Sequence, residues 1–194
     1  LEGWVNTPPA GTGDATLSNP GAGGSPGGYL NIRFGDQGGV PAYEEDTAYN
    51  TGADYTGNYQ EEGLSLRFSF YAEDMLPSTS IIYLHSDISD TTWEYAFDSS
   101  MVGSWEDFSV SFDYSAGWSG WGDADDFMAD LASIDWIGVN VARDWMNPAQ
   151  QDYGIDNWEY YITVPEPGAV YLLVSAFLSL GCAYRRRAGT RCTA

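Results

Sequence analysis

Basic side chains are scarce in this sequence, and lysine is absent altogether. Seven arginines stand against 28 aspartates and glutamates, which gives a formal net charge of -21. Four of these arginines lie in the last ten residues, so the first 164 residues hold three basic and 27 acidic side chains, a charge of -24. A surface of this sign repels phosphate backbones and anionic lipid headgroups, so we expect no nucleic-acid binding. Cations and neutral sugars suit it better as partners.

Cysteine is missing from the first 181 residues, so no disulfide can staple that part of the chain. About 160 residues can nevertheless bury enough apolar surface to fold without such a bridge. Cys182 and Cys192 both lie in the C-terminal segment, where a bridge would join a membrane-buried position to a cytoplasmic one. We therefore expect both thiols to be free.

Motifs for enzymatic chemistry are also missing. The only histidine, His85, stands on an expected strand, so a hydrolytic triad of serine, histidine and acid has little support. There is no P-loop, CxxC or HExxH motif. Paired carboxylates could hydrolyse glycosidic bonds, but 27 acids supply many pairs and nothing in the sequence selects one. We therefore expect that the protein is not an enzyme. A glycan-active enzyme is the alternative.

Aromatic residues, at 15% of the chain, indicate a folded core, since disordered acidic chains are usually poor in them. Segment 64–74, LSLRFSFYAED, alternates with period two and places Leu64, Leu66, Phe68 and Phe70 on one face of a strand. The other face carries Ser65, Arg67, Ser69 and Tyr71. Further strand patterns occupy residues 28–34, 81–87, 91–100, 105–115, 135–144 and 153–163.

Only residues 123–134 show helical spacing, with Phe127, Leu131 and Ile134 on one side, so we expect one short helix there. About seven strands bounded by Gly, Asp, Ser or Pro are typical of a sandwich. The sequence therefore predicts an all-β fold over residues 1–163, an antiparallel β-sandwich of the jelly-roll kind, followed by a single C-terminal transmembrane helix.

The C-terminal segment combines a short motif, an apolar run and a basic cluster. Residues 164–167 read VPEP, and residues 168–184 are 17 uncharged residues that span roughly 25 Å as a helix. Arg185, Arg186 and Arg187 follow, in a basic tail at 185–194. Arginines stay on the cytoplasmic side, so we expect a membrane helix that leaves the acidic domain outside.

This arrangement resembles the PEP-CTERM sorting signal of Gram-negative bacteria, in which Val164, Pro165, Glu166 and Pro167 match the motif. The resemblance implies that the protein is a substrate of an exosortase, a membrane cysteine transpeptidase. It also implies an exported protein, first tethered to the inner membrane with its domain in the periplasm, then passed to the outer surface or extracellular matrix. A plain membrane anchor is the alternative. Export requires a signal peptide, which we expect ahead of Leu1.

The first 160 residues resemble non-catalytic carbohydrate-binding modules of the galactose-binding-like jelly-roll class. The resemblance rests on an N-terminal GW, a W-x-x-F-x-V-x-F strand at 105–112 and a Y-x-I-D-N-W strand at 153–158. It implies a structural calcium ion on Asp156, with ligands from the N-terminal region such as Glu2 or Asp36. In the simpler interpretation, Asp156 caps or solvates a turn.

Three tryptophans lie in expected loops: Trp118 and Trp121 in AGWSGWGD, and Trp145 in ARDWMNP. Exposed indoles offer flat faces on which sugar rings stack, so these residues are the candidates for binding a polysaccharide. Alternatively they fold inward and cover one end of the sandwich. The tryptophans at 93, 105, 136 and 158 lie on expected strands, and we expect them in the core.

The sequence thus predicts an exported bacterial surface or matrix protein that is sorted by exosortase, with polysaccharide binding as a further hypothesis. One alternative is a purely structural matrix protein whose negative surface is bridged by divalent cations. The other is the glycan-active enzyme.

Overall fold

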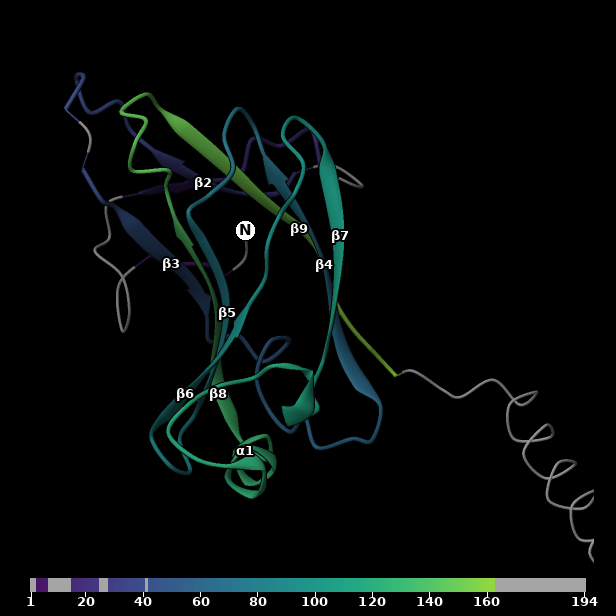
Figure 1. Ribbon diagram of the computed structural model, residues 1–194. Coiled ribbons are helices and arrows are strands. Elements are labelled where there is room, and N and C mark those ends of the chain that lie inside the picture. The colour runs from purple at the N-terminus through teal and green to yellow at the C-terminus, as the bar shows by residue number, and fades with distance from the viewer. Residues whose placement is uncertain (1–2, 7–14, 25–27, 41, 163–194) are drawn as a thin grey trace, which may run out of the picture. The chain divides into compact units, whose positions relative to one another are not determined.

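The computed structural model describes residues 3–6, 15–24, 28–40 and 42–162 (Figure 1). By its internal contacts the chain divides into two units, Leu1–Ile162 and Thr163–Ala194. The predicted sorting motif at 164–167, membrane helix at 168–184 and basic tail at 185–194 lie outside the described residues. Within the described ranges, no helix is both long enough and apolar enough to cross a bilayer.

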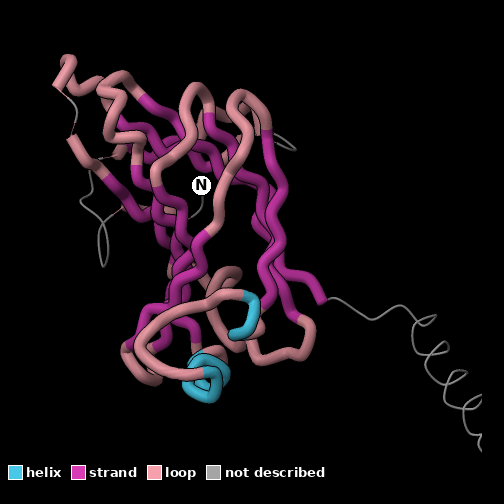
Figure 2. Tube along the Cα trace, in the orientation of Figure 1, coloured by secondary structure: helices cyan, strands magenta, loops and turns pink. Residues whose placement is uncertain are grey.

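The described part of the chain folds into nine strands and two short helical segments (Figures 1 and 2). The strands are β1 (Thr16–Ser18), β2 (Leu30–Phe34), β3 (Glu45–Asn50), β4 (Leu64–Ala72), β5 (Thr79–Ser86), β6 (Thr91–Ala96), β7 (Trp105–Ser111), β8 (Ile134–Ala142) and β9 (Gln151–Ile162). The helical segments are a 3-10 turn η1 (Tyr114–Ala116) and the helix α1 (Ala124–Asp130). The prediction of an all-β fold is confirmed.

The strands form two antiparallel sheets that face each other as the layers of a sandwich (Figure 2). A five-stranded sheet has the order β1-β2-β9-β4-β7, and a four-stranded sheet has the order β3-β8-β5-β6. The last strand, β9, lies in the middle of the five-stranded sheet, where Ile155 is the register partner of both Leu30 on β2 and Phe70 on β4. The predicted antiparallel sandwich is therefore confirmed.

Alternation along β4 builds the core as the sequence predicted. Leu66, Phe68 and Phe70 are fully buried between the sheets, whereas Arg67 points outward and is exposed. Each side chain of this size contributes roughly 1.5–3 kcal/mol to stability when it is fully buried. The phenyl rings of Phe68 and Phe70 both meet Phe97 edge-on, at 5.0 and 5.3 Å between centroids.

A bulge interrupts β9 at Asn157, which has a φ of 53°. The register against β4 shifts there, between the partners of Arg67 and Ser69. Before the bulge Tyr153 and Ile155 are buried in the core, and after it Trp158 and Tyr160 pack against the core. Asparagine tolerates the left-handed backbone that such an irregularity requires.

Strands β1 and β3 were not predicted. The sequence of β3 is EDTAYN, and its core-facing side chains include Asp46, which is 1% exposed. The Asp46 carboxylate accepts hydrogen bonds from the Ala15 backbone N–H at 3.0 Å and from Asn6 Nδ2 at 3.3 Å. Because polar groups with partners replace apolar ones here, the strand lacks the pattern that identifies its neighbours.

The helix α1 is shorter than the predicted range of 123–134. Asp123 caps it and forms a capping box with Asp126, as an acidic helix start should. Phe127, Leu131 and Ile134 are all buried, as predicted. The helix ends early because Ile134 exchanges two backbone hydrogen bonds with Gly57, each 2.8 Å long, and begins β8.

Candidate functional site

A cavity of about 330 Å³ lies on the outer face of the five-stranded sheet, where β4 ends and β7 begins. Three partly exposed aromatic rings and one carboxylate line it, together with small residues of the adjoining loops. The lining residues are Gly23, Tyr29, Tyr71, Glu73, Gly103, Ser104 and Trp105.

Strand register brings the aromatic walls together. On β4, Phe70 and Ala72 point into the core, so Tyr71 between them points outward. Tyr71 is the register partner of Trp105 on β7 and of Gly154 on β9. These three positions therefore form one row across the outer face of the sheet.

Gly154 leaves the space that the rings occupy. A Cβ at this position would lie 2.8 Å from Cη2 of Trp105 and 2.9 Å from Cδ2 of Tyr29. The ring of Trp105 meets Tyr29 edge-on at 82° and Tyr71 at 35°, with centroids 5.2 Å apart in both pairs. Trp105 is also fixed by its Nε1–H, which donates to the Gly23 carbonyl at 3.0 Å. The walls are thus held in place by the fold itself.

Carboxylates dominate the charge around the cavity. Burial raises the pKa of Glu73, and repulsion from Asp152 and Asp74 raises it further. Burial also raises the pKa of Tyr29, and the charge of Glu73 adds to this effect. Both shifts indicate an electronegative site in which a further negative charge is unfavourable.

Asp152 stays ionised beside the cavity because it has strong partners. Burial alone would raise its pKa, but hydrogen bonds from Asn31, Arg33 and Gln150 outweigh this and lower it. Arg33 Nε donates to Asp152 Oδ1 at 2.6 Å, and Gln150 Nε2 donates to the other oxygen of this carboxylate at the same distance. The guanidinium of Arg33 is therefore already neutralised by Asp152.

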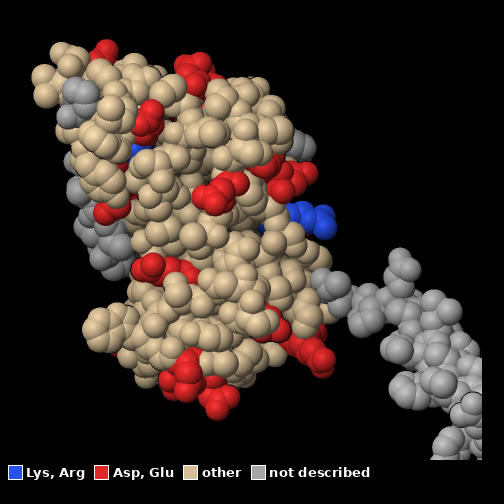
Figure 3. All heavy atoms as spheres, viewed as in Figure 1, with Lys and Arg blue, Asp and Glu red and all other residues tan. Residues whose placement is uncertain are grey.

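Exposed positive charge among the described residues is confined to this same face. Arg33 and Arg67 each have a side chain that is 51% exposed, whereas Arg143 is fully buried. Arg67 forms an ion pair with Glu159 at 3.1 Å and lies over the ring of Tyr161, 4.7 Å from its centroid. Figure 3 shows acidic atoms spread over the visible face with few basic atoms among them.

Trp118 does not lie on the surface, so the prediction that it offers an exposed ring is wrong. It is 3% exposed, and its Nε1–H donates to the Ser111 carbonyl at 2.8 Å. Its ring stacks on Phe127 of α1 and on Phe112, with centroids 5.5 and 6.0 Å away. The alternative interpretation, in which the ring folds inward and covers an end of the sandwich, is correct for this residue.

Trp121, by contrast, is 94% exposed. Its neighbours Gly120 and Gly122 pack so closely on Trp93 and Asp126 that a Cβ on either would come within 3 Å of them. These two contacts hold the loop down on both sides of residue 121, so its indole projects into solvent.

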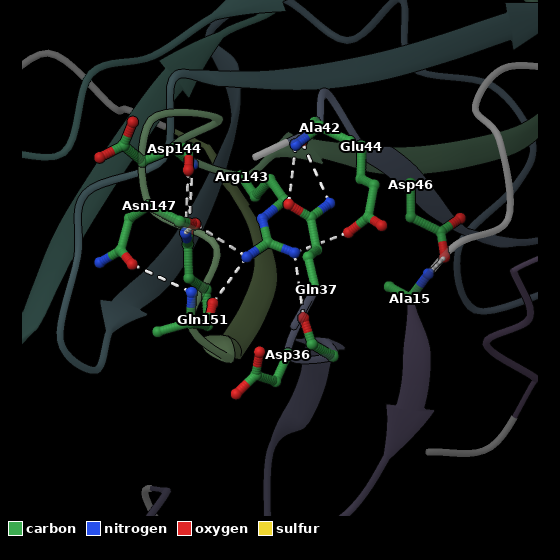
Figure 4. A network of polar contacts seen from close by, with 12 residues as sticks. Ala15, Asp36, Gln37, Ala42, Glu44, Asp46, Arg143, Asp144, Asn147 and Gln151 are labelled. Carbon is green, nitrogen blue, oxygen red and sulfur yellow. Dashed lines mark hydrogen bonds and ion pairs between the residues drawn. The ribbon is translucent and has the colours of Figure 1, made fainter. Parts of the chain in front are cut away.

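Trp145 is 51% exposed in the loop between β8 and β9. The buried Arg143 holds this loop in place (Figure 4). Arg143 donates to Glu44 Oε2 at 2.7 Å and to the carbonyls of Gly35, Asn147 and Ala149 at 2.6 to 3.0 Å. One guanidinium thus joins the loop after β2 to the loop that carries Trp145.

Trp121 and Trp145 do not share a site. The loop of Trp121 leads into α1 and the start of β8, whereas Trp145 follows the end of β8. Nine strand residues separate the two ends, a distance of about 30 Å.

Asp156 lies against the glycine-rich segment that precedes β2. Its Oδ2 lies 2.5 Å, and the Gly28 carbonyl oxygen 2.9 Å, from the point where a Cβ of Gly24 would be. Glu2 lies outside the described residues, and Asp36 instead accepts a hydrogen bond from the Gly38 backbone. Among the residues that the structure describes, no group of three or more Asp, Glu, His or Cys side chains could hold a metal ion.

The outer face of the four-stranded sheet also carries aromatic rings, but they are poorly accessible. Tyr83 is 8% and Trp136 is 6% exposed. The imidazole of His85 stacks on the Trp136 ring at 5.1 Å, and its Nδ1 lies 2.6 Å from Asp135. This face therefore offers less ring surface to a ligand than the cavity does.

The strand tryptophan at position 105 was expected in the core, and this expectation is wrong. It could have been corrected from the sequence, because Phe108, Val110 and Phe112 share one face of the strand and residue 105 has the opposite parity. Tyr71 was placed on the outer face of β4 correctly. Tyr29 and Gly154 carry no such signal, because their proximity depends on the pairing of β2 with β9.

The fold is similar to that of carbohydrate-binding modules in solved structures. The family 11 module of a cellulosomal cellulase of Clostridium thermocellum matches with a TM-score of 0.56 at 14% identity, over 86% of this chain and 92% of the module. A family 11 module from Clostridium thermocellum in complex with a β-1,3-1,4-mixed-linked tetrasaccharide matches with a TM-score of 0.55 at 15% identity, over 86% and 92% of the two chains. These likenesses show a jelly-roll sandwich.

An exo-β-agarase matches with a TM-score of 0.58 at 13% identity, over 85% of this chain and 24% of that chain. The similarity thus covers about a quarter of the agarase. No protein-family model matches the sequence, and no curated protein does either.

Proposed function

We propose that this domain is a non-catalytic carbohydrate-binding module that takes a glycan chain at the cavity on the five-stranded sheet. The observation that carries the proposal is the cavity itself, where Tyr29, Tyr71 and Trp105 surround an opening beside Glu73. Sugar rings have apolar C–H faces that stack on aromatic rings, and hydroxyls that bond to carboxylates and backbone groups. The family 11 module solved with a bound tetrasaccharide supports this function by the likeness of its fold.

The cavity would bind a sugar through two kinds of contact, stacking on aromatic rings and hydrogen bonds to hydroxyls. Trp105 and Tyr71 would stack on the ligand, since both are partly exposed and their rings are held at fixed angles. Glu73 and the Ser104 hydroxyl would bond to sugar hydroxyls. Trp121 and Trp145 project from loops elsewhere on the domain, so they would contact only a polymer long enough to extend beyond the cavity, and not a short oligosaccharide.

A catalytic role has less support at this place. Two-carboxylate hydrolysis needs one acid free to donate a proton and a second free to act as nucleophile or base. The charge of Asp152 raises the pKa of Glu73 more than the charge of Asp74 does, and Asp152 is held by Asn31, Arg33 and Gln150. We therefore assign the cavity to binding.

The test is a calorimetric titration of the full chain, in detergent solution, with soluble oligosaccharides. Trp105→Ala should weaken binding at least about tenfold, or ~1.4 kcal/mol, because it removes the largest wall. Trp121→Ala is the control, since it removes an equally large and more exposed indole outside the cavity. If Trp121→Ala abolished binding and Trp105→Ala did not, the site would lie at the loop. Circular dichroism of both variants checks that they fold.

We propose further that the protein is exported and sorted by an exosortase to the outer surface or extracellular matrix. The support is the sequence of residues 164–187, with VPEP, the apolar run and Arg185, Arg186 and Arg187 in fixed order. The test is the mass of the mature C-terminus after expression in a host that contains the exosortase. A new terminus near Pro165 to Pro167 that depends on this enzyme supports sorting. An intact Ala194 in the inner membrane indicates a plain anchor.

A structural calcium ion is proposed at Asp156. The Asp156 carboxylate and the Gly28 carbonyl both lie close to Gly24, and oxygen donors of this kind suit calcium. They would hold the segment before β2 against β9. The structural alternative, a matrix protein bridged by divalent cations, predicts instead that calcium joins separate molecules, and light scattering on addition of calcium distinguishes the two.

A further inference from the structure

The cavity on the five-stranded sheet has the composition of a cage for a cation. Tyr29 and Trp105 meet at 82° and Tyr71 tilts by 35° from Trp105, so the rings border the opening from different directions. A cationic group close to several ring faces is attracted by each of them. Among its lining residues the cavity has one charged side chain, the carboxylate of Glu73.

No free positive charge faces this carboxylate from the elements around it. Asp152 and Asp74 both add negative charge near Glu73, and Arg33 is the only cation that lowers its pKa. The Arg33 guanidinium is bound to Asp152 at 2.6 Å, so the pair contributes little net charge. The cavity therefore has a net negative charge.

Three classes of sugar would meet this site differently. A sulfated or uronic acid unit would be repelled by Glu73 and Asp74. A neutral unit would cover Glu73 and take away its water without supplying an opposite charge. A unit with a protonated amine would supply that charge and would also be attracted by the three rings.

We propose that the cavity selects a polysaccharide with free amino groups, such as a chain of glucosamine units. This proposal depends on the proposed function, because it assigns the class of sugar to the same cavity. Glu73 pairs with the ammonium group, and Tyr71 and Trp105 border it. The acidity of the rest of the domain draws a cationic polymer to the surface but does not fix its place.

The experiment compares three oligosaccharides of equal length on the full chain, by calorimetry at a pH where the sugar amine is protonated. They are a glucosamine oligomer, its fully N-acetylated form and a cello-oligosaccharide. The glucosamine oligomer should bind at least about tenfold more tightly than the other two. Tetramethylammonium and the glucosamine monomer are added as separate ligands, to distinguish an isolated cation site from a sugar site.

Two variants separate the cavity from general attraction between a polycation and an acidic protein. Glu73→Gln should weaken the binding of the glucosamine oligomer at least about tenfold more than it weakens that of the uncharged oligomers, because glutamine can still bond to sugar hydroxyls but cannot pair with an ammonium group. Glu62→Gln removes the same charge from an exposed turn before β4 and should change nothing. Equal losses in the two variants would overturn the proposal, since only overall charge would then matter.

The outcomes separate this inference from the proposed function. If the three oligosaccharides bind equally and Trp105→Ala weakens them all, the carbohydrate site stands and the selection of amines is wrong. If tetramethylammonium binds and no oligosaccharide does, both proposals are wrong. If nothing binds in the cavity, both are wrong as well.

Discussion

Gly154 lies directly beneath the indole of Trp105, with 2.8 Å between Cη2 and the place where a Cβ on residue 154 would be. The two residues are 49 positions apart in sequence and belong to strands that do not pair with each other, because β4 lies between them. Because Gly154 on β9 has no side chain, the ring of Trp105 on β7 can lie over it and form a wall of the cavity.

Gly154→Ala should push the rings of Trp105 and Tyr29 apart. The backbone at residue 154 is not left-handed, so the cost is steric and of the order of 1–3 kcal/mol. We expect a lower midpoint in urea unfolding and weaker oligosaccharide binding. Gly35→Ala is the matched control, because nothing lies within 4 Å of a Cβ there. An unchanged midpoint for Gly154→Ala would show that the rings rearrange freely.

Arg143→Met should destabilise the domain by roughly 3 kcal/mol, because it leaves Glu44 and three carbonyls without their shared donor. Thermal unfolding measures the loss. Arg67→Met removes an ion pair whose two side chains are about half exposed, and should cost less than about 1 kcal/mol. Similar losses in both variants would mean that Arg143 contributes only as a surface charge does.

Acidification should remove the contribution of Asp152 to stability. Its folded pKa is lower than its unfolded value, so the contribution is present above the unfolded pKa of 3.8 and is lost as the pH falls through the folded pKa. At neutral pH the Asp152→Asn variant should therefore be less stable than the unmodified chain. This difference in the free energy of unfolding should shrink as the pH falls below about 4. Urea midpoints at a series of pH values give this difference. A deficit independent of pH would mean that the carboxylate charge is not involved.

Calcium should raise the melting temperature of the chain if Asp156 holds an ion. At a calcium concentration 100 times the Kd, the stabilisation is about 2.7 kcal/mol. Asp156→Asn should lower this response strongly, whereas Asp36→Asn should not, because Asp36 accepts a hydrogen bond in an exposed turn. The same response in all three proteins would place the calcium elsewhere.

Where side chains alternate, the sequence was sufficient to predict the fold. The period of two along β4 predicted both the buried Phe68 and the outward Tyr71. The same pattern did not predict β3, because its inward-facing Asp46 is polar and accepts hydrogen bonds from Asn6 and from the backbone of Ala15. Hydropathy records burial, and it does not record a hydrogen bond to a distant segment.

The candidate site was harder to predict than the fold. A loop sequence does not show which way an indole turns, so Trp118 and Trp121 looked alike although one is 3% and the other 94% exposed. The cavity depends on the register of three strands, and register is a property of the paired sheet. Of its aromatic walls, only Tyr71 was placed correctly.

The central position of β9 also bears on the order in which the domain can be completed during synthesis. Strands β2 and β4 emerge from the ribosome long before β9 and have no partner on the sides that later flank it. Unpaired strand edges invite association with other chains, so the nascent domain is exposed to aggregation until its last strand arrives. A chain that stops before Gln151 keeps these edges unpaired permanently, so it should accumulate in the insoluble fraction despite the repulsion between its many carboxylates.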